Sequence, residues 1–189
     1  MALKYSTAVK NARLDAIETA IGASAVLKIR TGAAPANVSD ADTGAVLVTM
    51  NLPADYMAAA SAGSKAKSGT WQDAAADASG YAAHWRLYAS DGTTPHAQGD
   101  CFMPATAWAA STAYTVGQFV KNNARVYVCT VAGTSAGAGG PTTTGTGITD
   151  NTVTWNYVCP DTGELQLDSA VIAAGQQVTV SAFALTAGN

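Results

Sequence analysis

The sequence predicts a mainly β protein: a β-sandwich or jelly-roll-like host domain with one N-terminal amphipathic helix, plus a small inserted β module. Several short runs alternate large and small residues with a period of two, and turn residues separate them. Helical spacing is clear only near the N-terminus. The composition shifts to Thr, Gly and Asn between residues 105 and 159, which indicates a separate unit inside the host domain.

The helix is predicted from Ser6, a good N-cap residue, to Gly22, a natural stop. Between them, apolar residues recur at helical spacing and predict an amphipathic helix of about four turns. These residues are Val9, Ala12, Ala16 and Ala20, beside Leu14, Ile17 and Ile21.

The strands of the host domain are predicted from alternation and from the turns between them. Asp91-Gly92 is a strong turn signal, so residues 81–88 and 96–103 are expected to form a hairpin. Further strands are expected at residues 26–30, 45–50, 164–168 and 177–185.

The domain boundaries follow from the two ends of the inserted segment. Met103-Pro104 on entry resembles Cys159-Pro160 on exit. Insertions are tolerated at exposed hairpin tips, where the chain ends lie close together. We therefore expect a host domain of residues 1–104 and 160–189, and a module of residues 105–159.

Charge is sparse at 12% of residues, and it excludes some partners. Ten Lys and Arg residues face 13 Asp and Glu residues, so no basic stripe exists for a nucleic-acid backbone. The first 30 residues carry a net charge of +3 and the remainder −6, an asymmetry that could orient the N-terminal end toward an acidic partner. A surface with so little charge also suits faces that neighbouring subunits cover.

Neither a membrane span nor a signal peptide is expected. No apolar run approaches the roughly 18 residues that a spanning helix needs. Near the N-terminus, Arg13, Asp15 and Glu18 interrupt the stretch where the apolar core of a leader would lie.

The sequence does not predict an enzyme, a cofactor or a metal site. Known nucleophile, zinc-protease, phosphate-loop and dinucleotide motifs are absent, and no carboxylate pair has the setting of a glycosidase site. His84 and His96 could approach Asp100 or Cys101 across the hairpin and form a metal site; otherwise they are ordinary strand and turn histidines.

The three cysteines have no metal-site spacing. Cys101 and Cys159 flank the module, where the two host strands should be adjacent. They are either a disulfide that clamps the base of the module or free buried thiols. Cys129 lies in an alternating run and is expected to be a small buried residue.

Five aromatic residues are the candidate ligand-binding residues of the module. Flat aromatic faces are suited to sugar rings, but a unit of this size also needs large side chains for its own core. Both interpretations stay open for Trp108, Tyr114, Tyr127, Trp155 and Tyr157.

The module resembles the small chitin-binding carbohydrate-binding modules of family 5/12. The resemblance rests on the pattern Trp-x5-Tyr-x2-Gly-x2-Val from Trp108 to Val120, on Tyr127, and on a late tryptophan matched by Trp155. It implies a compact β-unit that binds sugar. The chain departs from the family after Tyr127, where residues 130–137 contain none of the exposed tryptophans that stack on the sugar.

The host domain resembles a family of tailed-bacteriophage virion proteins. The resemblance rests on residues 2–18 (ALKYSTAVKNARLDAIE), on residues 27–35 (LKIRTGAAP) and on the ending from residue 178 to LTAGN at 185–189. It implies a non-enzymatic virion protein that forms a homo-oligomer and contacts major capsid, tail or neck proteins. A capsid decoration protein is the first expectation. A tail, neck or fibre-base component and an adhesion protein for cell-surface glycans are the alternatives.

Overall fold

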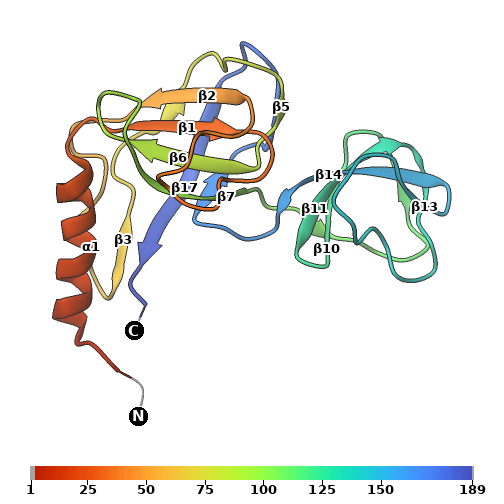
Figure 1. Ribbon diagram of the computed structural model, residues 1–189. Helices are drawn as coiled ribbons and strands as arrows, with labels where there is room; N and C mark the ends of the chain where they lie inside the picture. Colours follow the sequence, from red (N-terminus) through yellow and green to blue (C-terminus); the bar gives the residue numbers. More distant parts are fainter. Residues whose placement is uncertain (1–2, 189) are drawn as a thin grey trace.

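The structure is a computed structural model that describes residues 3–188. It is mainly β, with 41% of residues in strands and 8% in a helix, and a curled sheet forms a sandwich-like host domain. The predicted fold class is therefore confirmed. Figure 1 shows the helix α1 at one end of the molecule and the module, which contains β10, β11, β13 and β14, at the other.

The host sheet is built from segments on both sides of the module. Its strand order is β2-β1-β6-β7-β15-β17-β3, and β4 also pairs with β17. The backbone N–H of Asp77, just after β4, donates to the carbonyl of Leu47 in β2 at 2.8 Å, so the sheet curls back toward its first strand. The elements are α1 (Thr7–Ile21), β1 (Val26–Arg30), β2 (Val46–Asn51), β3 (Ser64–Ala66), β4 (Gln72–Asp73), β5 (Gly80–Tyr81), β6 (His84–Tyr88), β7 (Pro95–Phe102), β15 (Leu165–Leu167), β16 (Val171–Ile172) and β17 (Val178–Thr186).

The predicted hairpin is confirmed, because β6 and β7 pair antiparallel with Trp85 opposite Gly99. A side-chain carbon added at Gly99 would lie 2.8 Å from the Trp85 ring, so only glycine leaves room for the indole there. Trp85 meets Phe183 edge to face at 5.2 Å, and Trp71 packs against the same ring at 5.0 Å. These three rings provide much of the volume of a host core that is poor in large residues.

The helix has the predicted caps, and most of its apolar residues face outward. The Ser6 hydroxyl accepts a hydrogen bond from the Val9 N–H, and Gly22 ends the helix with a positive φ of 88°. Only Leu14 and Ile21 are buried, while Val9, Ala12, Ala16, Ile17 and Ala20 are exposed. Polar residues on the opposite side of the helix, together with Leu14 and Ile21, make the contacts with the host domain. In the described residues, no helix is long and apolar enough to cross a membrane.

The module has its own sheet, with the order β13-β14-β11-β10-β8, and a two-stranded pair of β9 with β12. Val120, Tyr127, Cys129, Val153 and Trp155 form its separate core. Its strands are β8 (Thr106–Ala107), β9 (Ala113–Tyr114), β10 (Phe119–Asn122), β11 (Arg125–Val131), β12 (Gly133–Thr134), β13 (Ile148–Asp150) and β14 (Val153–Pro160).

The module leaves and re-enters the host domain through neighbouring strands. Cys101 and Met103 on entry and Cys159 on exit pack in one buried cluster, so the two ends of the module lie together as expected. However, β7 and β15 pair in parallel, with Leu165 opposite Cys101. A tight hairpin cannot join parallel strands, so the module does not stand at the expected hairpin tip.

Candidate functional site

An aspartate organises most of the aromatic residues predicted for ligand binding. The buried Asp150 carboxylate accepts hydrogen bonds from the indole N–H of Trp108 at 2.8 Å and of Trp155 at 3.1 Å. Its other oxygen accepts from the backbone N–H of Ala136 at 2.9 Å. Tyr114 packs edge to face on Trp155, with ring centres 5.0 Å apart. These contacts assign Trp108, Trp155 and Tyr114 to the packing of the module.

Burial decides which of these rings could meet a ligand. Trp155 and Tyr127 are fully buried, whereas Trp108 and Tyr114 are half-buried against the same core. Nothing in the sequence predicts this role of Asp150, because two indoles 47 residues apart give no sign that they share a carboxylate.

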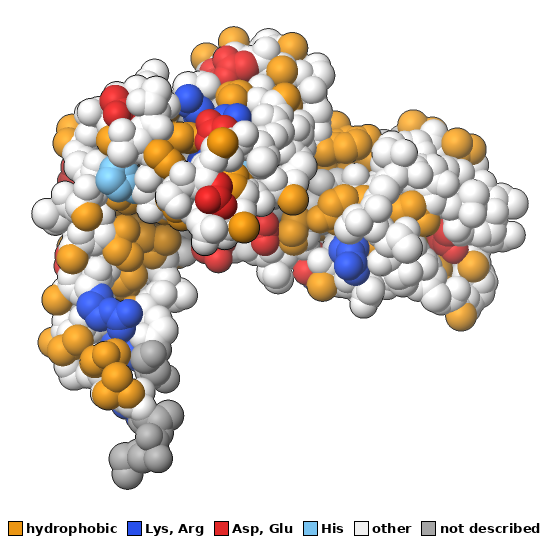
Figure 2. Space-filling model, in the orientation of Figure 1, with side chains coloured by type: hydrophobic (Ala, Val, Ile, Leu, Met, Phe, Trp, Pro, Cys, Tyr) orange, Lys and Arg blue, Asp and Glu red, His pale blue; other side chains and the backbone are white. Residues whose placement is uncertain are grey.

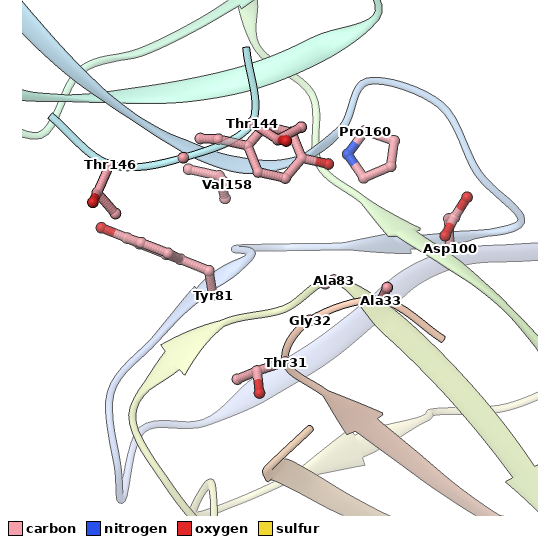
Figure 3. A pocket seen from close by; sticks show the side chains of 12 residues that line it. Thr31, Gly32, Ala33, Tyr81, Ala83, Asp100, Thr144, Thr146, Val158 and Pro160 are labelled. Carbon is pink, nitrogen blue, oxygen red and sulfur yellow. The ribbon is translucent and has the colours of Figure 1, made fainter. Parts of the chain in front are cut away.

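Tyr157 also packs against the module core, with its ring centre 6.1 Å from that of Tyr127, but it lines a cleft between the host domain and the module. This junction cleft has a volume of about 580 Å³ and combines residues from both parts of the chain. In Figure 3, Tyr81 of the host domain extends toward Thr146 of the module, and Asp100 lies at the far side of the cleft. The lining residues are Thr31, Gly32, Ala33, Tyr81, Ala83, Asp100, Thr144, Gly145, Thr146, Tyr157, Val158 and Pro160.

A buried arginine fixes the host wall of the cleft. Arg86 is 0% exposed and donates to the Asp42 carboxylate and to the carbonyl of Val38. Asp42 also accepts from the Tyr88 hydroxyl at 2.7 Å and pairs with Arg30 at 3.2 Å. This network holds the loop that follows β1, whose first residues line the cleft.

His84 also holds the loop that follows β1. Its Nδ1 lies 2.8 Å from the carbonyl oxygen of Gly32, and the side chain is fully buried. Burial lowers the pKa of His84, and the charges of Arg30 and Arg86 lower it further, although the Gly32 carbonyl opposes them. The neutral ring therefore carries its proton on Nδ1 and donates it to Gly32.

The module wall is held by hydrogen bonds around Tyr157. The Tyr157 N–H donates to the carbonyl of Gly145 at 2.8 Å, and the Gly147 N–H donates to the Asn156 side chain at 2.9 Å. The Asn156 amide in turn donates to the Tyr81 hydroxyl at 3.3 Å and so connects the two walls. Tyr81 is not among the predicted site residues because it lies outside the module, in the two-residue strand β5.

The electrostatics of the cleft are mildly acidic. Partial burial raises the pKa of Asp100, and the neighbouring charge of Glu164 raises it further. Burial raises the pKa of Tyr157 to about 12, with smaller effects from Cys159 and Asp100. The lining includes no Lys, Arg or His side chain. The cleft is therefore suited to a neutral ligand rather than to an anion.

The metal site considered from the sequence does not form in the part of the chain that is described. His84 faces Asp100 across the hairpin, but His96 is exposed. No group of three or more His, Cys, Asp or Glu side chains among residues 3–188 could hold a metal ion.

The cysteines are free, buried thiols. Cys101 and Cys159 are close enough for the charge of Cys159 to contribute to the raised pKa of Cys101, after the larger effect of burial. In the structure the pair is thus two free buried thiols, in place of the disulfide considered above. Cys129 lies in the module core, as its alternating run predicts.

Searches against protein-family models, curated proteins and solved structures found no match to this chain.

Proposed function

We propose that the protein is a non-enzymatic structural component of a bacteriophage virion, in the first place a capsid decoration protein. A tail, neck or fibre-base position is the alternative within the same proposal. The observation that carries the proposal is the apolar face of α1, which projects from the host domain at the end opposite the module. Figure 2 shows apolar and basic side chains mixed along this part of the surface.

The exposed face of α1 has the character of an interface. Val9 is 43% exposed and Ile17 39% exposed, and Leu3 before the helix is 68% exposed. Ala12, Ala16 and Ala20 lie on the same side of the helix and allow close approach of another backbone. An exposed surface so rich in apolar residues favours a protein partner.

The charges on α1 define the partner further. Asp15 and Glu18 lie on the host side of the helix and are paired with Lys65 at 2.8 and 2.9 Å. Arg13 is exposed on the apolar side, and Lys4 is exposed just before the helix. The free face is therefore apolar with a positive charge between Val9 and Ile17, and it fits an apolar groove that contains an acidic side chain on another virion protein.

The positions of α1 and the module support a role in which the protein displays the module on the particle surface. Figure 1 shows α1 and the module at opposite ends of the molecule. Docking through α1 directs the module away from the particle surface. The low overall charge agrees with an assembly that covers part of the chain.

Incorporation into particles tests the proposal. Phage particles are produced with the wild-type chain or with Ala16→Glu, which adds one charge to the centre of the exposed face. Because a buried charge without a partner strongly weakens an interface, we expect Ala16→Glu to lower the copy number per purified particle by about tenfold or more. Quantitative mass spectrometry of the particles measures the copy number.

Thr19→Glu is the matched control, since Thr19 is exposed on the same helix at the edge of the face. It should be incorporated at close to the wild-type level. Absence of the wild-type chain from purified particles, or equal incorporation of Ala16→Glu and wild type, contradicts the proposal.

A further inference from the structure

We propose that the junction cleft is a binding site for a short neutral saccharide, held between Tyr81 of the host domain and Tyr157 of the module. This inference goes beyond a role in virion assembly, because the cleft lies at the junction and does not involve α1. It also moves the expected sugar contact from the aromatic core of the module to its boundary.

The size and lining of the cleft fit one or two sugar rings. Its volume of about 580 Å³ lies within the range of about 300 to 1,000 Å³ that is usual for small-molecule sites. Both walls contribute an aromatic ring, and each ring combines an apolar face with a polar hydroxyl. Ala33, Ala83 and Val158 add apolar surface between them. Sugar rings, which have C–H faces and hydroxyl edges, match this combination.

The cleft also offers polar groups that are free to bind. Among residues 3–188, neither the Asp100 carboxylate nor the Tyr157 hydroxyl has a hydrogen-bond partner, and the hydroxyls of Thr144 and Thr146 have none either. A carboxylate accepts hydrogen bonds only, whereas hydroxyls both donate and accept. The ligand must therefore present several hydroxyl donors, as a saccharide does.

Charge decides between saccharide classes. No basic side chain lines the cleft, and Asp100 with the neighbouring Glu164 makes its surroundings acidic. Phosphorylated, sulfated or sialylated sugars would meet uncompensated negative charge. The site therefore selects neutral sugars.

The walls are held in place before any ligand binds. The Asn156 amide connects Tyr81 to the module, and the carbonyl of Gly145 fixes the backbone of Tyr157. On the host side, His84 holds Gly32. A site that is already ordered loses little conformational entropy on binding, which favours measurable affinity for a small ligand.

Ligand-observed NMR and calorimetry on the purified full-length protein test the proposal. The probes are neutral tetrasaccharides of glucose, galactose and N-acetylglucosamine, with sialyllactose and a sulfated disaccharide as anionic comparators. We expect at least one neutral probe to bind, and both anionic probes to bind at least about tenfold more weakly. Failure of all neutral probes to bind, or preference for an anionic one, overturns the proposal.

Substitutions locate the site. Tyr81→Ala and Tyr157→Ala should each weaken binding by about tenfold or more. Ala33→Trp, at an exposed position on the cleft wall, should abolish binding by filling the cleft without disturbing either core. Tyr5→Ala removes an exposed tyrosine far from the cleft and should bind as wild type does.

Circular dichroism verifies that each variant is folded, and Ala33→Trp keeps the test decisive if a tyrosine variant is not. Undiminished binding in folded Ala33→Trp contradicts the assignment. Because the assay uses isolated protein, its outcome is separate from that of particle incorporation.

Discussion

At the scale of single residues, two buried polar side chains organise the surroundings of the candidate site. Asp150 accepts three hydrogen bonds and ties two indoles and a loop together inside the module. His84 connects the host sheet to the loop that lines the cleft. A buried polar group is stable only when its partners are present, so each of these residues fixes the position of several others.

His84 predicts a pH dependence of stability. Its pKa is lowered in the folded state, so below the ordinary value of 6.5 the unfolded chain binds a proton that the folded chain does not. His84 therefore favours folding fully above pH 6.5, and its contribution is lost as the pH falls below that value. We expect the free energy of unfolding to decrease between pH 7.5 and 5.0, as measured by urea denaturation.

The variant His84→Asn keeps an N–H near the place of Nδ1 that can donate to Gly32, but it cannot titrate. It should lose less stability over the same pH interval than the wild type does. His96→Asn, which alters the exposed histidine, is the control and should follow the wild-type profile. Identical pH profiles for the wild type and His84→Asn would show that His84 is not responsible.

At the scale of elements, α1 is attached to the host domain through polar contacts. Lys65 in β3 is 2% exposed and pairs with both Asp15 and Glu18. Asp15 also accepts from the Ala60 N–H, and Asn11 accepts from the Gly63 N–H. This mode of attachment explains why the apolar stripe of the helix stays available on the outer side.

The attachment of α1 should depend on the Lys65 amine. Lys65→Met removes the cation and leaves two carboxylates facing an apolar side chain, so we expect α1 to detach. Hydrogen exchange measured by mass spectrometry should show a loss of protection of about tenfold or more in α1 peptides. Lys67→Met, whose amine contacts only the Gly69 carbonyl, is the control and should leave α1 protected. Unchanged protection of α1 in Lys65→Met would contradict this account.

The same contact has a defined pH range. Burial lowers the pKa of Lys65, but the hydrogen bonds to Asp15 and Glu18 outweigh it and leave the pKa above 10.5. The hydrogen bond from Lys65 lowers the pKa of Asp15 below 3.8. The ion pair that attaches α1 to Lys65 is thus fully formed at pH values between 3.8 and 10.5. It weakens when acid protonates Asp15 or when strong alkali deprotonates Lys65.

At the scale of the whole molecule, the host domain and the module share part of one core. Val126, Val128 and Val158 belong to the module sheet, yet they pack in the same cluster as Cys101 and the host strands. The inner side of the module is therefore buried by the host domain. We expect the two parts to unfold together.

Hydrogen exchange at increasing urea concentrations tests this coupling. Peptides from β1 and from β11 should lose protection at the same urea concentration, within about 0.3 M. Val158→Ala should lower the free energy of unfolding by about 2 kcal/mol. The urea midpoints of both peptides should therefore fall together. Val116→Ala, at a position 64% exposed, is the control and should change neither. Separate midpoints in the wild type would show that the module is an independent folding unit.

The sequence by itself determined the features that depend on local spacing. The caps of α1, the hairpin of β6 and β7, and the long strands β1, β2 and β17 follow from patterns within a few residues of one another. The strands β3, β4, β5 and β16 contain two or three residues each, which is too few to show an alternation. For this reason β3 and β16 were not predicted.

Only the tertiary structure decided which faces are covered and where the candidate site lies. The apolar stripe of α1 faces outward because Lys65, 50 residues from Asp15, binds the opposite side of the helix. Tyr81 and Tyr157 line one cleft because the module returns to the host domain beside β7. Contacts between residues so far apart depend on how the sheets close and pack, and no local pattern in the sequence records that.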